Sequence, residues 1–439
     1  MFFLSKLAIC VPTYQRLNNI KNICANELPL FDDLGIDLYI IDSSIDDDTE
    51  KFVKSKQVKY KILFYIRFDK EIDSNTKVYK ILQMAGEQIK CDYIWIRSDA
   101  LFSHELLIRG LIGILNKNKY DFLVLNPHGR FLDNALEDVL EIDDRQILFE
   151  NYTWILTMYG TAILSVKRML SLVDWGYMTS RYLKDDCINY SHVCLFFEII
   201  NIIKQPKILV INTQFFFGSM PNQISSWIKE TFYITLVIWP NAIKLLPDAY
   251  INKNKVIHTL LDIAFFRYRS LEFLKDIGIL TPKLAYEYRN EIEEYTNISF
   301  DDVYAISEGE ILHKEIREPL EYYPLIDFAR KYERLVIYGC GKRAKRYAGY
   351  LLENGIDFEA FLVTKVHNNV DNVLDHPVLQ AGQYKFTRDI GVIMGLKIEY
   401  QREVFSYMRA KNLLEQTFSY PVTFSELKSF LDKLEKFTL

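Results

Sequence analysis

The sequence lacks any C-x-x-C pair, and most of its six cysteines stand in apolar runs. Such cysteines are typical of buried free thiols in a reducing compartment. It also lacks an apolar run of the roughly 18–20 residues that cross a bilayer. The nearest candidate, residues 231–246, is interrupted by Pro240, Asn241 and Lys244. The apolar N-terminus has no basic n-region and no small-residue cleavage site, so it is interpreted as a first strand. We therefore expect a cytoplasmic protein.

A surplus of positive charge is missing as well. The chain has 53 Lys and Arg against 58 Asp and Glu, a net charge of -5. Proteins that bind nucleic acid usually carry a basic excess, so no nucleic-acid partner is expected. The composition, 49% hydrophobic and 25% charged, is that of a soluble globular protein. A length of 439 residues exceeds one ordinary core and predicts two or three domains.

The first 130 residues alternate between strand and helix patterns. Strands are predicted at 6–12, 36–42, 60–68, 92–97 and 120–126, and helices at 16–28, 47–55, 75–90 and 103–117, the last with Ser103 as its N-cap. This alternation predicts an α/β fold with a mostly parallel sheet flanked by helices.

The rest of the chain changes character twice. A mixed stretch with an apolar strand at 207–212 leads to a helical region from 226 to about 326, whose aromatics recur at i, i+3, i+4 spacing. That region is interpreted as a packed helical layer or oligomer surface, with peripheral contact to a membrane that carries a lipid-linked acceptor as the alternative. A third α/β pattern starts near Arg334. We expect three parts: 1–225, 226–330 and 331–439.

Polar residues follow three of the predicted strands. The first ends in Val11-Pro12-Thr13-Tyr14, the second in Asp42-Ser43-Ser44, and the strand near 96 in Asp99. Ligands of open α/β sheets bind outside the carboxyl ends of the strands. These residues therefore predict a nucleotide pocket, in which Tyr14 offers a ring and Asp42 accepts from a base or ribose group. A helix cap is the alternative role for Asp42 alone.

The runs CVPTYQRLNNIKNIC and IIDSSIDDDTE, followed by a strand that ends in an acid, resemble the GT-A fold glycosyltransferases of the large family-2 group. Members often have a V-P-[TS]-[YF]-[NQ]-R run and then a D-[ND]-[SG]-S-x-D-[GD]-T run, and both match here in order and at the expected separation. The resemblance continues through Asn75 and Lys77 and spans residues 5–220. It implies a bacterial enzyme that moves a sugar from a nucleotide-sugar, a UDP-sugar first, to a hydroxyl of a glycan, glycolipid or glycoprotein.

The resemblance also implies roles for particular residues. Thr13 and Tyr14 would lie against the base, and Asp42 would accept from it. Asp99 would lie at the diphosphate and bind a divalent cation, Mn²⁺ or Mg²⁺. The full set of candidate nucleotide-sugar-binding residues is Pro12, Thr13, Tyr14, Arg16, Asp42, Ser44, Lys77, Arg97, Ser98 and Asp99.

The sequence departs from the family pattern at Asp99. The family usually has two or three acids there, whereas Ser98 and Ala100 flank this one. A divalent cation takes several oxygen ligands, so Arg97 or Lys77 is the alternative source of positive charge for the leaving diphosphate.

An inverting transfer needs a carboxylate that removes the proton of the acceptor hydroxyl. Asp186 and Asp185 are the candidates, with Asp186 preferred; the alternative is that they favour the dipole at a helix N-terminus. His192, in the same segment, is interpreted as a packed core residue. On the acceptor side the resemblance implies a turn at Gly160 and Thr161 that enters a helix.

The C-terminal part contains a G-x-G-x-x-A run, GCGKRA at 339–344, between a strand and a helix. Small residues there permit close approach to a pyrophosphate, but the usual acid that closes the next strand is absent, since that strand ends in Thr364. This part resembles the small Rossmann-like domains appended to some bacterial surface-polysaccharide enzymes. We expect a structural or assembly role for this part and no organic cofactor, with a dinucleotide site as the alternative. A homo-oligomer is considered separately, for the chain as a whole.

Three hypotheses follow from the sequence. The first is a glycosyltransferase of surface polysaccharide or protein glycosylation, and the second is a non-catalytic nucleotide- or glycan-binding partner of a glycan-assembly complex. The third, an oxidoreductase built on the GCGKRA run, is disfavoured by the missing acid.

Overall fold

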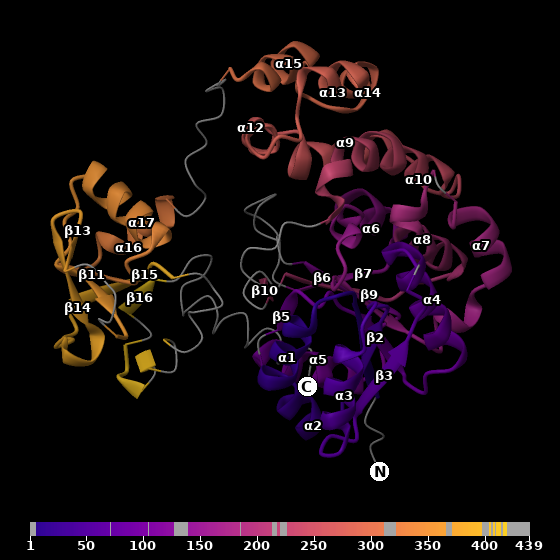
Figure 1. Cartoon of the computed structure of the whole chain (residues 1–439), viewed down its shortest axis with the longest axis horizontal. Helices are drawn as coiled ribbons and strands as arrows, with labels where there is room; N and C mark the ends of the chain where they lie inside the picture. Colours follow the sequence, from indigo (N-terminus) through magenta and orange to yellow (C-terminus); the bar gives the residue numbers. More distant parts are fainter. Residues whose placement is uncertain are drawn as a thin grey trace.

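The computed structural model describes residues 6–126, 139–212, 217–219, 226–310, 322–365 and 371–396, apart from 71, 104 and 185, together with several residues between 404 and 418. Figure 1 shows a large sheet with its helices, a layer of helices above it, and a smaller α/β unit to the left.

The large sheet has eight strands in the order β3-β2-β1-β4-β8-β6-β9-β7. Their bounds are β1 Leu7–Thr13, β2 Asp37–Asp42, β3 Leu63–Arg67, β4 Tyr93–Ile96, β6 Phe122–Asn126, β7 Val139–Ile142, β8 Ala162–Ser165 and β9 Ile208–Asn212. The first four strands are mutually parallel, and β8 runs antiparallel to both of its neighbours. The predicted α/β class and the strands predicted from the sequence are therefore confirmed. The short strands β5 (Leu101–Ser103) and β10 (Phe217–Ser219) form a separate antiparallel pair.

Helices cover both faces of this sheet (Figure 1). Their bounds are α1 Leu17–Asn26, α2 Leu28–Leu34, α3 Asp48–Gln57, α4 Ser74–Glu87, α5 Glu105–Asn116, α6 Arg145–Tyr152, α7 Trp175–Tyr182 and α8 Ser191–Ile202. Two expectations were wrong. Ser103 belongs to β5 and is not the N-cap of α5, and the Gly160 turn enters strand β8 and not a helix.

The alternation of side chains along β1 explains the two layers. Leu7, Ile9 and Val11 are buried in one core, with residues of α1, α2, α3 and α5. Ala8 and Cys10 point to the opposite face and are buried in a second core, with α4 and α8. A strand that is apolar on both faces must lie between two layers. β1 is accordingly an interior strand, between β2 and β4, and its carboxyl end lies between theirs.

The helical region is continuous with the second core. Its helices are α9 Thr231–Tyr233, α10 Trp239–Leu245, α11 Lys253–Leu260, α12 Tyr268–Asp276, α13 Pro282–Glu287, α14 Arg289–Tyr295 and α15 Phe300–Glu308, with π-helical turns at Ile234–Ile238 and Leu261–Phe265. The ring of Trp239 packs against that of Tyr190, with 4.9 Å between centroids. The helical interpretation is confirmed. Among the described residues, no helix combines the length and the apolar character that a membrane crossing requires.

The C-terminal unit has its own sheet, in the order β13-β14-β12-β11-β15-β16. Its elements are α16 Tyr322–Ala329, β11 Arg334–Tyr338, α17 Lys342–Glu353, β12 Ala360–Val363, β13 Asn372–Val373, β14 His376–Gln380, β15 Ile390–Met394 and β16 Thr417–Phe418. All neighbours in this sheet are parallel except β13 and β14. The predicted strand-turn-helix around Gly339 is confirmed.

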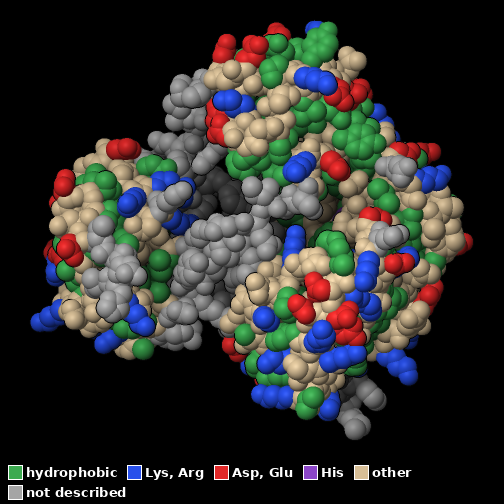
Figure 2. Space-filling model, in the orientation of Figure 1, with side chains coloured by type: hydrophobic (Ala, Val, Ile, Leu, Met, Phe, Trp, Pro, Cys, Tyr) green, Lys and Arg blue, Asp and Glu red, His purple; other side chains and the backbone are tan. Residues whose placement is uncertain are grey.

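Figure 2 shows one face of the molecule, on which Lys and Arg side chains and Asp and Glu side chains are scattered among hydrophobic and other side chains. None of the six cysteines, all of which lie in the described part, is in a disulfide, and four of them are buried. The expectation of buried free thiols is confirmed for these four cysteines.

Candidate functional site

The carboxyl ends of β1 and β2 lie side by side at one edge of the large sheet. Thr13 is paired in register with Asp42, and the backbone N–H of Ser43 donates to the carbonyl of Thr13 at 3.3 Å. The backbone N–H of Gln15 donates to Oγ of Ser44 at 2.8 Å. The two polar turns that the sequence singles out are therefore joined into one surface.

Asp99, beyond the end of β4, is held by two residues at the end of β1 and in the turn that follows it, Thr13 and Arg16. Its Oδ2 accepts from Thr13 Oγ1 at 2.8 Å, and its Oδ1 pairs with Arg16 Nη1 at 2.9 Å. The side chain of Asp99 is 3% exposed and that of Arg16 is 37% exposed. Each carboxylate oxygen thus already has a donor, one of them a cation that reaches in from the surface.

Lys77 supplies a second cation from the first turn of α4. That helix starts here because the Asp73 side chain accepts from the N–H groups of the first turn, at Asn75 and Thr76. The ammonium of Lys77 donates to the carbonyl of Thr13 and to Ser43 Oγ, and the residue is 3% exposed.

Burial lowers the pKa of Lys77 to about 8, although the nearby carboxylates of Asp42 and Asp99 act in the opposite direction. Arg16 lowers this pKa as well, because like charges repel. We refer to Thr13, Arg16, Asp42, Lys77 and Asp99 as the strand-end cluster.

Asp42 is fully buried and is satisfied from within the chain. Its carboxylate accepts from the N–H of Ser44 at 2.8 Å, from the hydroxyl of Tyr65 at 2.9 Å and from Nη1 of Arg67 at 3.2 Å. It does not cap α3, whose N-cap is Asp47. Any ligand group that reached Asp42 would have to share it with these donors.

Tyr65 and Arg67 are not among the residues predicted from the sequence. Both belong to β3 and are two residues apart, so they share one face of that strand beside the end of β2. That spacing next to a predicted strand end was the available signal. Burial raises the pKa of the Tyr65 phenol, and the carboxylate of Asp42 adds to this effect.

The remaining residues of the two turns differ in accessibility. Tyr14 is 47% exposed, so its ring is available to a ligand. Pro12 lies within β1, opposite Ile41, and is partly buried. Ser98 accepts from the N–H of Ala100 at 3.2 Å, which closes the turn that carries Asp99.

Arg97 lies elsewhere, which corrects its expected role at a diphosphate. It is fully buried, and its two terminal nitrogens each donate to one oxygen of Glu27 at 2.7 Å. Ser103 joins this pair, because its N–H donates to Glu27 at 2.8 Å and its hydroxyl accepts from Arg97 at 3.2 Å. Glu27 thus binds the chain on both sides of Asp99, at Arg97 before it and at Ser103 after it.

Of the candidate bases, Asp185 lies outside the described residues. Asp186 is exposed in the turn before a 3₁₀ turn, Ile188–Tyr190, that leads into α8. Among the described residues, no contact connects Asp186 to the strand-end cluster. Its role as a base stays a prediction.

His192 is a packed core residue, as expected. Its ring lies 5.0 Å from that of Tyr159, and burial lowers its pKa to about 4. The hydroxyl of Tyr159 donates to Asn75 at 2.9 Å. The start of α8 is therefore linked to the turn of α4 that carries Lys77.

The residues around Asp99 fit a divalent cation poorly. Within the described residues, no three His, Cys, Asp or Glu side chains gather as metal ligands. Mn²⁺ and Mg²⁺ are held by several oxygen ligands, whereas here a single carboxylate is available, with both of its oxygens already bonded to Thr13 and Arg16.

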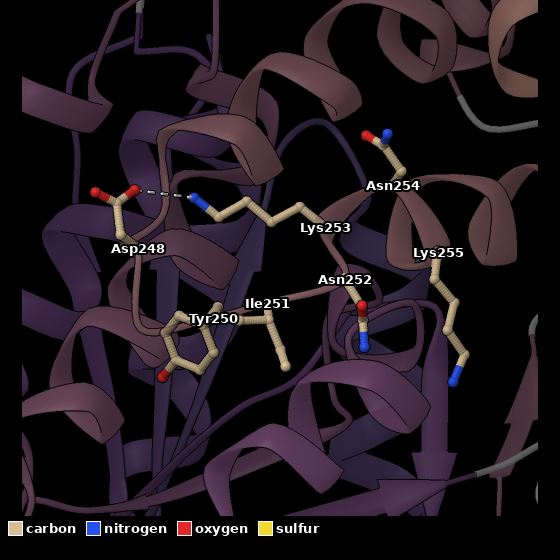
Figure 3. A pocket seen from close by; sticks show the side chains of 7 residues that line it. All are labelled: Asp248, Tyr250, Ile251, Asn252, Lys253, Asn254 and Lys255. Atoms are coloured by element: carbon tan, nitrogen blue, oxygen red, sulfur yellow. Dashed lines mark ion pairs between the residues drawn. The ribbon is translucent and has the colours of Figure 1, made fainter.

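A separate hollow lies at the turn between α10 and α11 (Figure 3). It has a volume of about 750 Å³ and is lined by Asp248, Tyr250, Ile251, Asn252, Lys253, Asn254 and Lys255. Its polar groups stabilise the fold. Lys253 donates to the carbonyls of Lys244 and Leu246 at the C-terminal end of α10, and Asn252 and Lys255 bind Glu150 of α6. This hollow does not compete with the strand-end cluster as a candidate site.

No family model matches the sequence, and no curated protein matches it either. Among solved structures, residues 1–349 of TarS from S. aureus in complex with UDP-GlcNAc align over 69% of this chain and 90% of that one, at 11% identity and a TM-score of 0.39. Another structure of the same fragment gives a TM-score of 0.41.

Glucosyl-3-phosphoglycerate synthase from Mycobacterium tuberculosis, in complex with Mn²⁺, UDP and glucosyl-3-phosphoglycerate, aligns over 56% of this chain and 82% of that one, at 13% identity and a TM-score of 0.37. Similarities at this level do not assign a family to the chain.

Proposed function

We propose that this protein is a glycosyltransferase that takes a sugar from a nucleoside diphosphate sugar, with UDP-sugars as the first donors to test. The acceptor is a hydroxyl group of a glycan, glycolipid or glycoprotein. The observation that carries the proposal is the convergence of the PTY and DSS turns with Asp99 and Lys77 at one sheet edge. Those are the segments that resemble nucleotide-sugar enzymes, and they come from four different elements of the fold.

The chemistry of the cluster supports a diphosphate donor. The exposed ring of Tyr14 offers a stacking surface for a base. Arg16 and Lys77 provide positive charge beside it, and fixed cations stabilise the charge that develops on a leaving diphosphate.

In the proposed inverting reaction, the acceptor oxygen attacks the anomeric carbon while the bond from that carbon to the diphosphate oxygen breaks. The electron pair of the broken bond leaves with the nucleoside diphosphate, and the acceptor proton passes to a carboxylate. Asp186 is the proposed base, with Asp185 as its alternate.

The test is donor hydrolysis and transfer over a panel of UDP-, GDP-, CDP- and dTDP-sugars, with the wild type, Asp99→Asn and Asp33→Asn. Asp99→Asn weakens the hold on Arg16 and should abolish turnover of the preferred donor. Asp33→Asn is the control, since Asp33 pairs with Arg109 on the surface. Binding of one donor without transfer to any glycan acceptor would favour the non-catalytic partner instead.

Comparing Asp186→Asn with the wild type tests the base. Loss of transfer with unchanged donor binding is the expected result, because the base touches the acceptor and not the nucleotide. Full transfer by Asp186→Asn would remove this residue from the mechanism and leave Asp185 to be tested in the same way.

A further inference from the structure

The pairing of Arg16 with Asp99 points to a donor site that works without a metal. We propose that the guanidinium of Arg16 takes the place of a divalent cation beside Asp99, so that the diphosphate of the donor binds in the absence of Mn²⁺ or Mg²⁺. This inference rests on the proposed function and specifies how the same site neutralises its ligand.

Geometry is the first support. Asp99 is almost fully buried and is fixed by the hydroxyl of Thr13, which orients its second oxygen toward Arg16. Arg16 uses Nη1 for this contact and is 37% exposed at its side chain. A guanidinium has five N–H donors in a fixed fork, so the exposed part of Arg16 remains able to donate to phosphate oxygens, which arginine binds in a bidentate manner.

The arrangement of charge is the second support. Lys77 lies close enough to Asp99 and Arg16 for both to shift its pKa. The carboxylate of Asp42 is already paired with Arg67. Arg16 and Lys77 together therefore supply two positive charges around one carboxylate, Asp99, which is the charge that a divalent cation would bring to the same place.

The ligand set is the third support. A divalent cation at Asp99 would lie beside the positive charge of Arg16, which repels it, and the neighbouring positions 98 and 100 are Ser and Ala. Among the described residues, Asp99 belongs to no group of three or more His, Cys, Asp or Glu side chains that could hold a metal ion. Binding a cation against the repulsion of Arg16, or at the loss of its charge-assisted bond, in exchange for a single carboxylate ligand is unfavourable.

The experiment measures binding of UDP, GDP, CDP and dTDP by calorimetry, with EDTA or with Mn²⁺. The proteins are the wild type, Arg16→Ala, Arg16→Lys and the control Arg109→Ala. Arg109 also pairs with carboxylates and is 46% exposed, but it lies on α5, paired to residues outside the cluster. Thermal unfolding of each variant verifies that it is folded.

We expect one nucleotide to bind the wild type in EDTA with a Kd within about threefold of that in Mn²⁺, a small difference on the scale where about 1.4 kcal/mol is tenfold. Arg16→Ala should weaken this binding by about tenfold or more, the usual effect of losing one charge-assisted hydrogen bond. Arg16→Lys should fall in between, since lysine keeps the charge and loses the fork. Arg109→Ala should bind as the wild type does.

Two results would overturn the inference and leave the proposed function intact: wild-type binding that needs Mn²⁺, or Arg16→Ala binding as tightly as wild type in EDTA. If none of the four nucleotides binds in either buffer, the proposed function itself fails, and this inference falls with it.

Discussion

The buried ion pair of Arg97 and Glu27 is expected to contribute strongly to the free energy of unfolding. Its two hydrogen bonds of 2.7 Å lie in a fully buried environment, and the guanidinium also lies 5.7 Å from the Trp95 ring centroid and 5.8 Å from that of Phe31. Glu27→Ala would leave the charge of Arg97 buried without its carboxylate. Breaking such a pair costs about 3–5 kcal/mol, a large share of the roughly 5–15 kcal/mol that stabilises a typical protein.

The matched variant is the double substitution Glu27→Leu with Arg97→Met, which removes both charges and keeps apolar volume. Replacing a buried ion pair in this way is often close to neutral. We therefore expect urea unfolding midpoints to fall strongly for Glu27→Ala and for Arg97→Met, and much less for the double variant. The difference between the single and double variants gives the coupling free energy.

A nucleotide-binding measurement on the double variant separates the two roles considered for Arg97. If this arginine serves the fold, the double variant should still bind the nucleotide that the wild type binds. A loss of less than about 1 kcal/mol in Glu27→Ala, the range of exposed ion pairs, would refute the reasoning. So would a folded double variant that no longer binds nucleotide, which would return Arg97 to the donor site.

Three further predictions concern pH and backbone strain. Because burial lowers the pKa of Lys77 to about 8, nucleotide affinity measured by calorimetry should fall as pH rises from about 7 to 9, and Lys77→Arg, which stays charged, should flatten the profile. The pKa of His192 is lowered to about 4, so the unfolded chain binds more protons than the folded one between about pH 4 and 6.5. The free energy of unfolding in urea should therefore drop by about 3 kcal/mol as the pH falls from about 6.5 to 4. His192→Gln, measured at the same two pH values, should lack this part of the drop. Gly160 has φ of 103° and a Cβ there would lie 3.1 Å from Leu101, so Gly160→Ala should lower the free energy of unfolding in urea by about 1–3 kcal/mol. Gly349, within helix α17, has open space around it, so Gly349→Ala should raise that free energy by about 0.5–1 kcal/mol. Equal effects of the two substitutions would contradict the strain at Gly160.

Much of the large sheet is predictable because its signals are local. An apolar run that ends in a small polar residue marks both the strand and its carboxyl end, and β1 and β2 end within one residue of the positions expected. Strand ends in turn predict which side chains meet, since parallel neighbours share an edge. The meeting of Thr13, Asp42 and Asp99 follows from this rule alone.

The contacts that local sequence patterns do not predict depend on partners distant in the chain. Arg97 follows a strand and looks accessible, but Glu27, 70 residues earlier, takes its charge. The same carboxylate binds the N–H of Ser103, which draws that residue into β5 in place of the cap that local rules favour. The pairing of Arg16 with Asp99 spans 83 residues and is equally invisible to local patterns.

The continuity of the hydrophobic core has a consequence for how the chain melts. One core runs from Ala8 in the first strand to Ile306 in the last helix of the helical region, so the expected boundary near residue 225 passes between tightly packed side chains. The C-terminal unit keeps two cores of its own, formed by residues from 325 onward. Parts that share a core unfold together, and parts that do not can unfold separately. Scanning calorimetry should accordingly resolve one cooperative transition for the sheet with its helical layer and a second for the C-terminal unit.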